Sequence, residues 1–196
     1  MEINPVVLTG KIIRLEPLSL EHIPDLFEVG RDDSIWKYMV YGSIKVMDDM
    51  RAWVEDLLNR QAQGTDLPFT VVLIDTCIAI GATRYLDIRP DDRALEIGGT
   101  WYGTAYQRTG VNTEAKYLLL RHAFERLDCV RVQLKTDMRN IRSQKAIERI
   151  GAVKEGVLRK HMILPDGYVR DSVIYSIIDT EWPSVRAHLE EKMRNY

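Results

Sequence analysis

The sequence has only two cysteines, and this scarcity excludes two classes of small protein. Cys77 and Cys129 lie far apart inside apolar segments, with no Cys-x-x-Cys pair and no histidine close enough to complete a zinc set. A disulfide-stapled fold and a structural zinc site both need a framework of closely spaced residues. We therefore expect both cysteines to be small buried side chains, and we expect no metal site.

Long hydrophobic runs are also lacking. The longest uncharged apolar stretch covers residues 69–74, far short of the ~20 residues that a membrane-spanning helix needs. Residues 1–10 have neither the charged start nor the apolar middle of a secretory signal. The expected protein is cytoplasmic and does not enter a membrane.

The chain has no excess of charge of either sign. Its 27 Lys and Arg residues are balanced by 29 Asp and Glu residues, which leaves a formal net charge of -2. Proteins that bind nucleic acids generally hold the phosphates with a surplus of basic side chains. General nucleic-acid binding is therefore not expected.

No linker rich in proline, glycine or serine divides the 196 residues, and no repeat is visible. The 45% hydrophobic and 29% charged residues are typical of a soluble globular protein. A folded chain of this size buries roughly 70% of the surface that its unfolded form exposes. We expect one domain over residues 1–196, with a core that needs no disulfide.

Hydrophobic periodicity predicts the order of helices and strands. In chain order we expect a strand over 11–17, helices over 19–30 and around 50–58, strands over 69–74, 78–85 and 94–102, a helix over 113–127, a strand over 130–136, a helix over 140–150, two strands joined by a turn at 165–167, and a helix from about 180. Gly98 and Gly99 interrupt the strand over 94–102, which predicts a bulge or a close backbone approach.

The strand, helix and strand over residues 94–136 require one parallel crossover inside an otherwise antiparallel sheet. The predicted class is α+β (α/β). Its centre is a mixed, mostly antiparallel sheet of about seven strands, with helices on both faces and one parallel pair.

The polar loop over residues 107–115 is the strongest candidate binding feature. A helix that starts there presents unpaired N–H groups and the positive end of its dipole, and Gly110 lets the backbone close around an anion. Pyrophosphate is the natural ligand, and an ordinary strand-to-helix turn is the alternative. The loop is not a Walker phosphate loop, because Thr104 and Ala105 stand where Lys and Ser or Thr are required.

The loop Gln107-x-x-Gly110-x-Asn112 resembles the Gln/Arg-x-x-Gly-x-Gly/Ala acetyl-CoA loop of the GNAT superfamily, and specifically of its ribosomal-protein-type (RimJ/RimL-like) N-acetyltransferase branch. Asn112 departs from the pattern by filling the last small position. The similarity covers nearly the whole chain. Its other motifs are Gly10-Lys-Ile-Ile-Arg-Leu-Glu-Pro-Leu, Thr113-Glu-Ala, Ala123-Phe124, Asn140-x-x-Ser143, Gly151-Ala152, Glu155-Gly156-Val-Leu-Arg159, Asp166-Gly167 and Glu181-Trp182.

The resemblance implies the GNAT fold, with acetyl-CoA as co-substrate and a splayed parallel pair that admits its pantetheine arm. Backbone amides over residues 107–113 would hold the pyrophosphate. The residues implied for the coenzyme are Gly99, Thr100, Trp101, Gln107, Arg108, Thr109, Gly110, Val111, Asn112, Thr113, Asn140 and Ser143. A basic cluster follows the second strand of the pair, and it either binds phosphate or forms a solvated face. Its members are Lys135, Arg139, Arg142 and Lys145.

Acetyl transfer to an amine needs a base for the ammonium proton, donors for the oxyanion and a partner for the thiolate. The resemblance implies Glu96 as a carboxylate that acts directly or through water. Leu95 and Ile97 flank it, which predicts partial burial. A rim carboxylate paired with an arginine is the alternative. Backbone N–H groups over residues 99–101, freed by the bulge, are candidates for the oxyanion site.

Ser143 is the candidate partner of the thiolate. Ile147 stands where many GNAT relatives have a tyrosine acid, and the resemblance implies that Ser143 takes this role. Met162 occupies the position that matches a carboxylate of the ribosomal branch, and His161 lies beside it. The base therefore stays open between Glu96 and His161, and a structural role is the alternative for the histidine.

The acceptor is the part of the site that the sequence defines least. Trp36, Tyr38 and Tyr85 lie in or near segments that the family places around the acceptor, and packing in the core is the equal alternative. An N-terminal α-amine has a pKa near ~8 and Lys near ~10.4, which favours a peptide or protein N-terminus. A small-molecule amine, another acyl group such as succinyl, and a non-catalytic acyl-CoA-binding module are the alternatives. The sequence is compatible with a homodimer.

Overall fold

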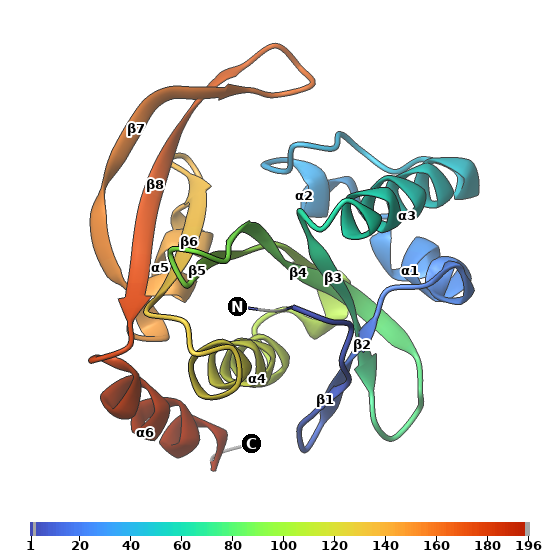
Figure 1. The fold of residues 1–196 in the computed structure, drawn as a ribbon. Coiled ribbons are helices and arrows are strands. Elements are labelled where there is room, and N and C mark those ends of the chain that lie inside the picture. The colour runs from blue at the N-terminus through green and yellow to red at the C-terminus, as the bar shows by residue number, and fades with distance from the viewer. Residues whose placement is uncertain (2, 195–196) are drawn as a thin grey trace.

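The computed structural model describes residues 1 and 3–194, which form a mixed sheet of eight strands with helices around it (Figure 1). The strands are β1 (Leu8–Thr9), β2 (Ile13–Pro17), β3 (Leu67–Leu73), β4 (Ala79–Arg89), β5 (Ala94–Tyr102), β6 (Arg131–Asp137), β7 (Val153–Ile163) and β8 (Val169–Ile178), in the order β1-β2-β3-β4-β5-β6-β8-β7. The β5–β6 pair is parallel and every other pair is antiparallel. The predicted parallel crossover is therefore confirmed, and the two-residue β1 is the strand that the sequence did not indicate.

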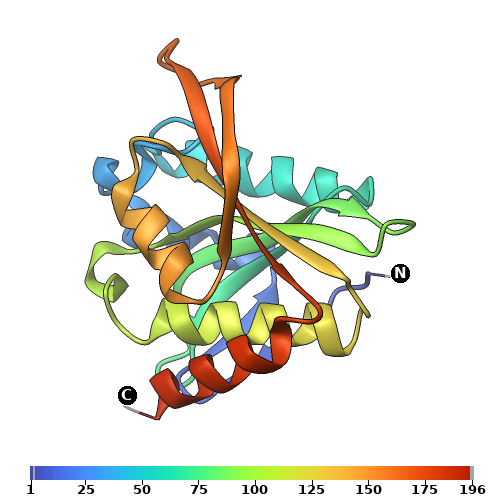
Figure 2. The same cartoon turned by 90° about the vertical axis from the view of Figure 1, so that its left-hand side faces the viewer.

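Helices cover both faces of the sheet, as predicted. They are α1 (Ile23–Gly30), α2 (Asp33–Trp36), α3 (Met47–Ala62), α4 (Val111–Glu125), α5 (Ile141–Arg149) and α6 (Trp182–Met193), with short 3-10 turns at η1 (Leu20–His22) and η2 (Thr104–Tyr106). On one face α1 and α3 contact β4 and β3, and on the other α4 contacts β1 and β2 while α6 packs against α4 (Figure 2). Across the described residues, no helix is both long and apolar enough to cross a membrane.

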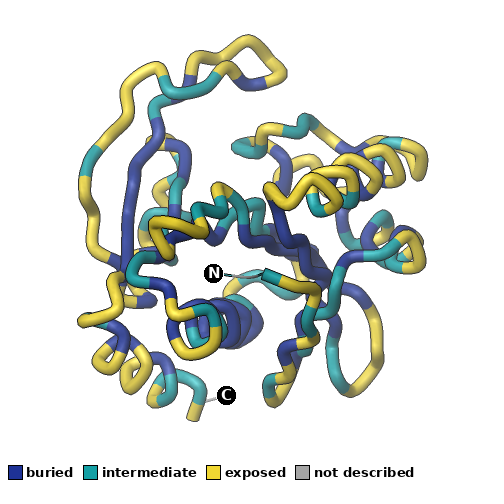
Figure 3. The backbone as a smooth tube through the Cα atoms, in the orientation of Figure 1, coloured by how far each residue is buried: buried dark blue, intermediate teal, exposed yellow. Residues whose placement is uncertain are grey.

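The two layers of helices give the protein two hydrophobic clusters. The larger one surrounds α4, whose Leu118, Leu119 and Leu120 are all buried although they point in different directions around the helix. The smaller one joins α1, α2 and α3 to the opposite face of the sheet. Figure 3 shows α4 as a buried element, whereas the outer strand β7 is largely exposed. The sheet thus separates two hydrophobic clusters, one on each of its faces.

Local chemistry explains where several helices begin and end. Pro24 lies in the first turn of α1, where its missing N–H is no loss. Asp49 accepts the backbone N–H groups of Lys45 and Val46 at the start of α3. Gly64 follows α3 with a φ of +72°, a left-handed conformation that glycine adopts without strain. The predicted helix around residues 50–58 is therefore confirmed and is longer than its apolar stripe.

Candidate active site

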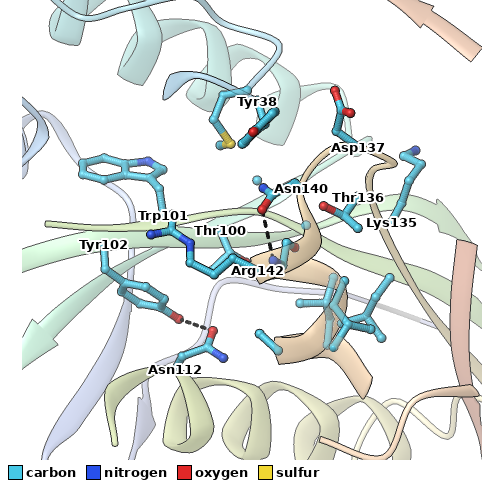
Figure 4. A pocket seen from close by; sticks show the side chains of 18 of the residues that line it. Tyr38, Thr100, Trp101, Tyr102, Asn112, Lys135, Thr136, Asp137, Asn140 and Arg142 are labelled. Atoms are coloured by element: carbon cyan, nitrogen blue, oxygen red, sulfur yellow. Dashed lines mark hydrogen bonds between the residues drawn. The ribbon is translucent and has the colours of Figure 1, made fainter. Parts of the chain in front are cut away.

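The parallel strands β5 and β6 pair only at their beginnings. Residues 94–96 lie opposite residues 131–133, after which β5 continues to Tyr102 and β6 to Asp137 without further pairing between them. A cleft of about 630 Å³ opens where the strands separate. Side chains of β5, β6, α4 and α5 line it (Figure 4). The splayed pair implied by the sequence resemblance is present in the structure.

Strand β5 is bulged where it enters the cleft. Arg84 lies opposite Gly98 but Ala82 lies opposite Trp101, so β5 carries an extra residue at this point. Gly99 has a φ of +58°, and a Cβ there would lie 2.9 Å from Nε of Arg84. The bulge predicted from the glycine pair is confirmed. The main-chain ladder with β4 therefore skips Gly99 and Thr100.

The first turn of α4 borders one end of the cleft. Thr109 Oγ1 accepts the N–H of Val111 at 3.3 Å. The N–H groups of Asn112 and Thr113 donate to none of the described residues. Free amides at the positive end of a helix form a site for an anion.

Side chains connect this loop to α5 across the mouth of the cleft. Gln107 donates from Nε2 to the carbonyl of Tyr102 at 3.0 Å, and its Oε1 accepts a hydrogen bond from Arg142 at 2.7 Å. The Tyr102 hydroxyl donates to Oδ1 of Asn112 at 3.2 Å (Figure 4). The bond between Gln107 and Arg142 thus connects the loop before α4 to α5. Residues of both segments were expected to bind the coenzyme.

Ser143 lies on the α5 wall of the cleft with a free hydroxyl. Asn140 caps α5 by accepting the backbone N–H of Ser143 at 3.0 Å (Figure 4). The Ser143 hydroxyl itself has no hydrogen-bond partner in the part of the chain that the structure describes. Ile147, one turn further along α5, is buried and closes the wall.

Glu96 is buried at the point where the parallel pairing stops. Its Oε2 accepts a hydrogen bond from Gln133 at 2.9 Å and forms an ion pair with Lys135 at 3.1 Å. The residue is 2% exposed, and it lines the cleft. The expected burial is confirmed, and the partner is a lysine of β6 instead of the arginine considered from the sequence. Oε1 accepts no hydrogen bond from any described residue and is free for a ligand.

Aromatic residues close the side of the cleft that lies beyond Glu96. The guanidinium of Arg139 lies 3.4 Å from the ring centre of Tyr168 and 5.5 Å from that of Tyr38. Asp137 holds the same guanidinium at 2.8 Å. These contacts connect the turn between β7 and β8 to the segment between α2 and α3. Tyr38, which was expected near the acceptor, lines the cleft.

The other two aromatic residues expected at the acceptor do not line the cleft. Trp36 is 2% exposed, donates from Nε1 to the carbonyl of Gly30 at 2.7 Å, and packs on Trp101. Tyr85 is fully buried on the α4 face of the sheet, where its hydroxyl donates to the carbonyl of Leu119 at 2.6 Å. Both side chains therefore pack in the core, which was the alternative expectation: Trp36 in the smaller hydrophobic cluster and Tyr85 in the larger one.

The protein family follows from a match to known sequences. The Acetyltransferase (GNAT) domain family matches residues 13–153. The chain belongs to the GNAT acetyltransferase family. The crystal structure of a "putative acetyltransferase" from T. thermophilus is 39% identical, covers 98% of this chain and 99% of that chain, and has a TM-score of 0.89.

Two GNAT relatives from Bacillus subtilis (strain 168) bear on the branch. "Uncharacterized N-acetyltransferase YnaD" is 24% identical, covering 89% of this chain and 98% of the relative. "Putative ribosomal N-acetyltransferase YdaF" is 34% identical over 91 residues, which are 46% of this chain and 49% of the relative. The chain is thus similar over about half of its length to a putative ribosomal N-acetyltransferase.

Acidic, histidine and cysteine side chains are not grouped for metal binding in this GNAT enzyme. Within residues 1 and 3–194, no three of them are close enough to hold an ion. Cys129 is buried as expected, but Cys77 is exposed in the turn between β3 and β4 with a φ of +58°. The apolar run that suggested burial for Cys77 ends before this turn.

The basic cluster expected after β6 is divided between two tasks. Lys135 and Arg139 are paired with Glu96 and Asp137. Arg142 contacts the coenzyme loop, and Lys145 is exposed one turn of helix away. The cluster is thus not a single phosphate patch.

Sequence reasoning missed Lys116 of α4. It is 6% exposed, and its Nζ donates to Oγ1 of Thr100 at 2.6 Å. Burial lowers the pKa of Lys116 to about 7. The available signal was the apolar run Tyr117 to Leu120 that follows it directly in the same helix.

Proposed function

We propose that this GNAT enzyme transfers the acetyl group of acetyl-CoA to a primary amine, with the α-amine of a peptide or protein as the preferred acceptor. The observation that carries the proposal is the continuous cleft between the splayed strands. Free helix amides at Asn112 and Thr113 lie at one end, and the buried carboxylate of Glu96 lies at the other. A long acyl carrier and an amine can thus meet from opposite sides of the sheet.

The donor set fits the phosphates of coenzyme A. The first turn of α4 offers unpaired amides, and Arg108, Arg142 and Lys145 add positive charge around the same opening. Backbone amides and cationic side chains are the groups that bind phosphate most strongly. Bound acetyl-CoA would supply a thioester carbonyl as the electrophile.

The residues around the junction of the strands can support direct attack by an amine. Glu96 would accept the ammonium proton at Oε1, either directly or through water, and the neutral nitrogen would attack the carbonyl carbon. N–H groups of the β5 bulge, over residues 99–101, would stabilise the oxyanion. The carbon–sulfur bond then breaks, and the free hydroxyl of Ser143 would donate a hydrogen bond to the departing thiolate.

Two features favour Glu96 over His161 as the base. Glu96 lines the cleft, whereas His161 does not. The His161 ring bonds the Ser172 hydroxyl at 3.0 Å, and burial, with Lys135 and Arg170 nearby, lowers the pKa of His161. His161 is therefore a neutral ring held by the hairpin β7–β8.

The preference for an α-amine rests on acidity. An α-amine, with a pKa near ~8, is more readily deprotonated by a carboxylate than a lysine with a pKa near ~10.4. The likeness to YdaF supports the same acceptor class.

A two-stage experiment tests the proposal. Acetyl-CoA at 100 times its Kd should stabilise the fold by about 2.7 kcal/mol, and NAD or ATP should do much less. Gly110→Val should weaken this effect by filling the loop, whereas Gly156→Val should not, because nothing lies within 4 Å of a Cβ at Gly156. Release of free CoA is then measured with amino-terminal peptides, polyamines and lysine peptides. Binding of acetyl-CoA without turnover on any amine would indicate a non-catalytic module instead.

A further inference from the structure

Arg170 is a buried cation without an ion-pair partner in the described part of the chain. It lies near the start of β8, is 6% exposed, and borders the cleft. Its Nε donates to the hydroxyl of Ser172 at 2.9 Å. Among residues 1 and 3–194, no acidic side chain forms an ion pair with its guanidinium.

Three other cations that line the cleft or lie beside it have acidic partners. They form the ion pairs Arg84–Asp66 at 3.1 Å, Lys135–Glu96 at 3.1 Å and Arg139–Asp137 at 2.8 Å. Each of the three acids thus already has a basic partner. Among the described residues, the guanidinium of Arg170 has no acidic partner.

A buried guanidinium without a counter-ion destabilises the folded protein unless a ligand supplies the missing negative charge. Burial lowers the pKa of Arg170, yet an arginine stays protonated in a protein and cannot lose its charge as a lysine can. Burying a charge without a counter-ion is costly, and the cost is recovered when an anion binds.

The position of Arg170 indicates that the anion it binds is part of the acceptor. Arg170 lies opposite Met162 in the hairpin, and Ser172, two residues along, lies opposite Asp137 of β6. Arg170 thus lies near the carboxyl end of β6, whereas the free amides belong to the first turn of α4. Asp137 and Glu96 are both close enough to raise the pKa of Arg170, against the larger effect of burial, which lowers it. The free Oε1 of Glu96 and the guanidinium of Arg170 therefore serve the same chamber.

We propose that Arg170 binds a carboxylate of the acceptor, so that the preferred substrate carries its amine and a carboxylate close together. This inference rests on the proposed function. The carboxylate belongs either to the acidic side chain of a residue at or next to the amino terminus of a peptide, or to the α-carboxyl group of a free amino acid. In either case the acceptor is bound at two points of opposite charge.

Matched pairs of acceptors test the inference. The peptides are C-terminally amidated and carry aspartate or asparagine, and glutamate or glutamine, at the first or second position. The third arm compares free amino acids with their amides. We expect at least one acid to exceed its amide by ~10- to 100-fold in kcat/KM, as for a hydrogen-bonded charge pair. The arm that shows the preference identifies the source of the carboxylate.

Variants of the arginine connect the preference to its side chain. Arg170→Gln should reduce the ratio of kcat/KM for the acid to that for its amide to about one, and Arg170→Lys should retain part of the preference. Arg159→Gln, an exposed arginine of the same hairpin, is the matched control. Melting temperature and acetyl-CoA affinity are measured on each variant, since a counter-ion for the coenzyme would lower the affinity.

Each outcome separates this inference from the proposed function. Equal rates with acids and amides, or an unchanged preference in Arg170→Gln, would overturn the role of Arg170 and leave the acetyltransferase activity in place. Loss of acetyl-CoA affinity in Arg170→Gln would move the anion to the coenzyme and also overturn it. Absence of turnover in the wild-type enzyme with every amine would remove the proposed function itself.

Discussion

The carboxylate of Glu114 accepts the backbone N–H of Ile13 at 2.9 Å, although 101 positions separate the two residues. The same carboxylate accepts the N–H groups of Lys11 and Ile12 at 2.6 and 2.9 Å. A Cβ on Gly10 would lie 2.4 Å from its carboxyl carbon, so glycine is needed there. The first turn of α4 is thus fastened to the start of β2, and two motifs that are distant in sequence form one structural unit.

Glu114→Gln should destabilise the protein by about 2–4 kcal/mol, because an amide nitrogen would face backbone donors in a site that is 4% exposed. Urea unfolding measures the change, with exposed Glu55→Gln of α3 as a control that should stay within about 0.5 kcal/mol. Equal stability of the wild type and Glu114→Gln would show that the three bonds add nothing over hydration.

Ser143 and Asn140 should separate catalysis from stability. Asn140→Ala removes the cap of α5 and should cost about 1 kcal/mol of stability. Ser143→Ala removes a hydroxyl that no described residue bonds, so its stability should change little while turnover falls more than acetyl-CoA affinity. Melting temperature and turnover are measured on both variants. A fully active Ser143→Ala enzyme would exclude this residue from the mechanism.

Glu96→Gln should lower turnover by about 10² to 10⁴ and leave acetyl-CoA affinity nearly intact. Gln133→Ala, which removes one donor to Oε2, should have a smaller effect. Near-normal turnover in Glu96→Gln would exclude Glu96 as the base.

Lys116 should make stability depend on pH. Its pKa is about 7 in the folded protein and 10.5 for an ordinary lysine, so the unfolded chain binds more protons between these values. The free energy of unfolding therefore gains a contribution that rises from pH 7 to pH 10.5. Lys116→Met should be more stable than the wild type near pH 7, with the gap closing toward pH ~10. Unfolding at several pH values measures this gap, and a gap that does not vary with pH would contradict the buried, depressed state. Exposed Lys154→Met is the control.

Contiguous signals explain what could be predicted from the sequence. The long apolar periods indicated α3 and α4, and the coenzyme loop was recognised because its residues are adjacent in the chain. Helix α2 was missed because it has one turn and no periodicity, although Asp32 caps it locally by accepting the N–H of Ser34.

Contacts between strands explain what could not be predicted. Tyr85 and Tyr38 have the same chemistry, but Tyr85 lies in a stretch of β4 that is buried on both faces, so alternation could not reveal its direction. The pair Glu96–Lys135 and the solitary Arg170 depend on the register of β5, β6 and β8. No local pattern carries that information.

The separation of β5 from β6 places a sheet edge inside the protein. Edge strands normally face water, where their unpaired main-chain groups can recruit another polypeptide and start aggregation. Here residues of α4, α5 and the hairpin β7–β8 line the cleft along this edge of β5. The unpaired N–H and C=O groups of β5 therefore lie inside a cleft, where they are less accessible to a second polypeptide than the same groups of an outer edge strand.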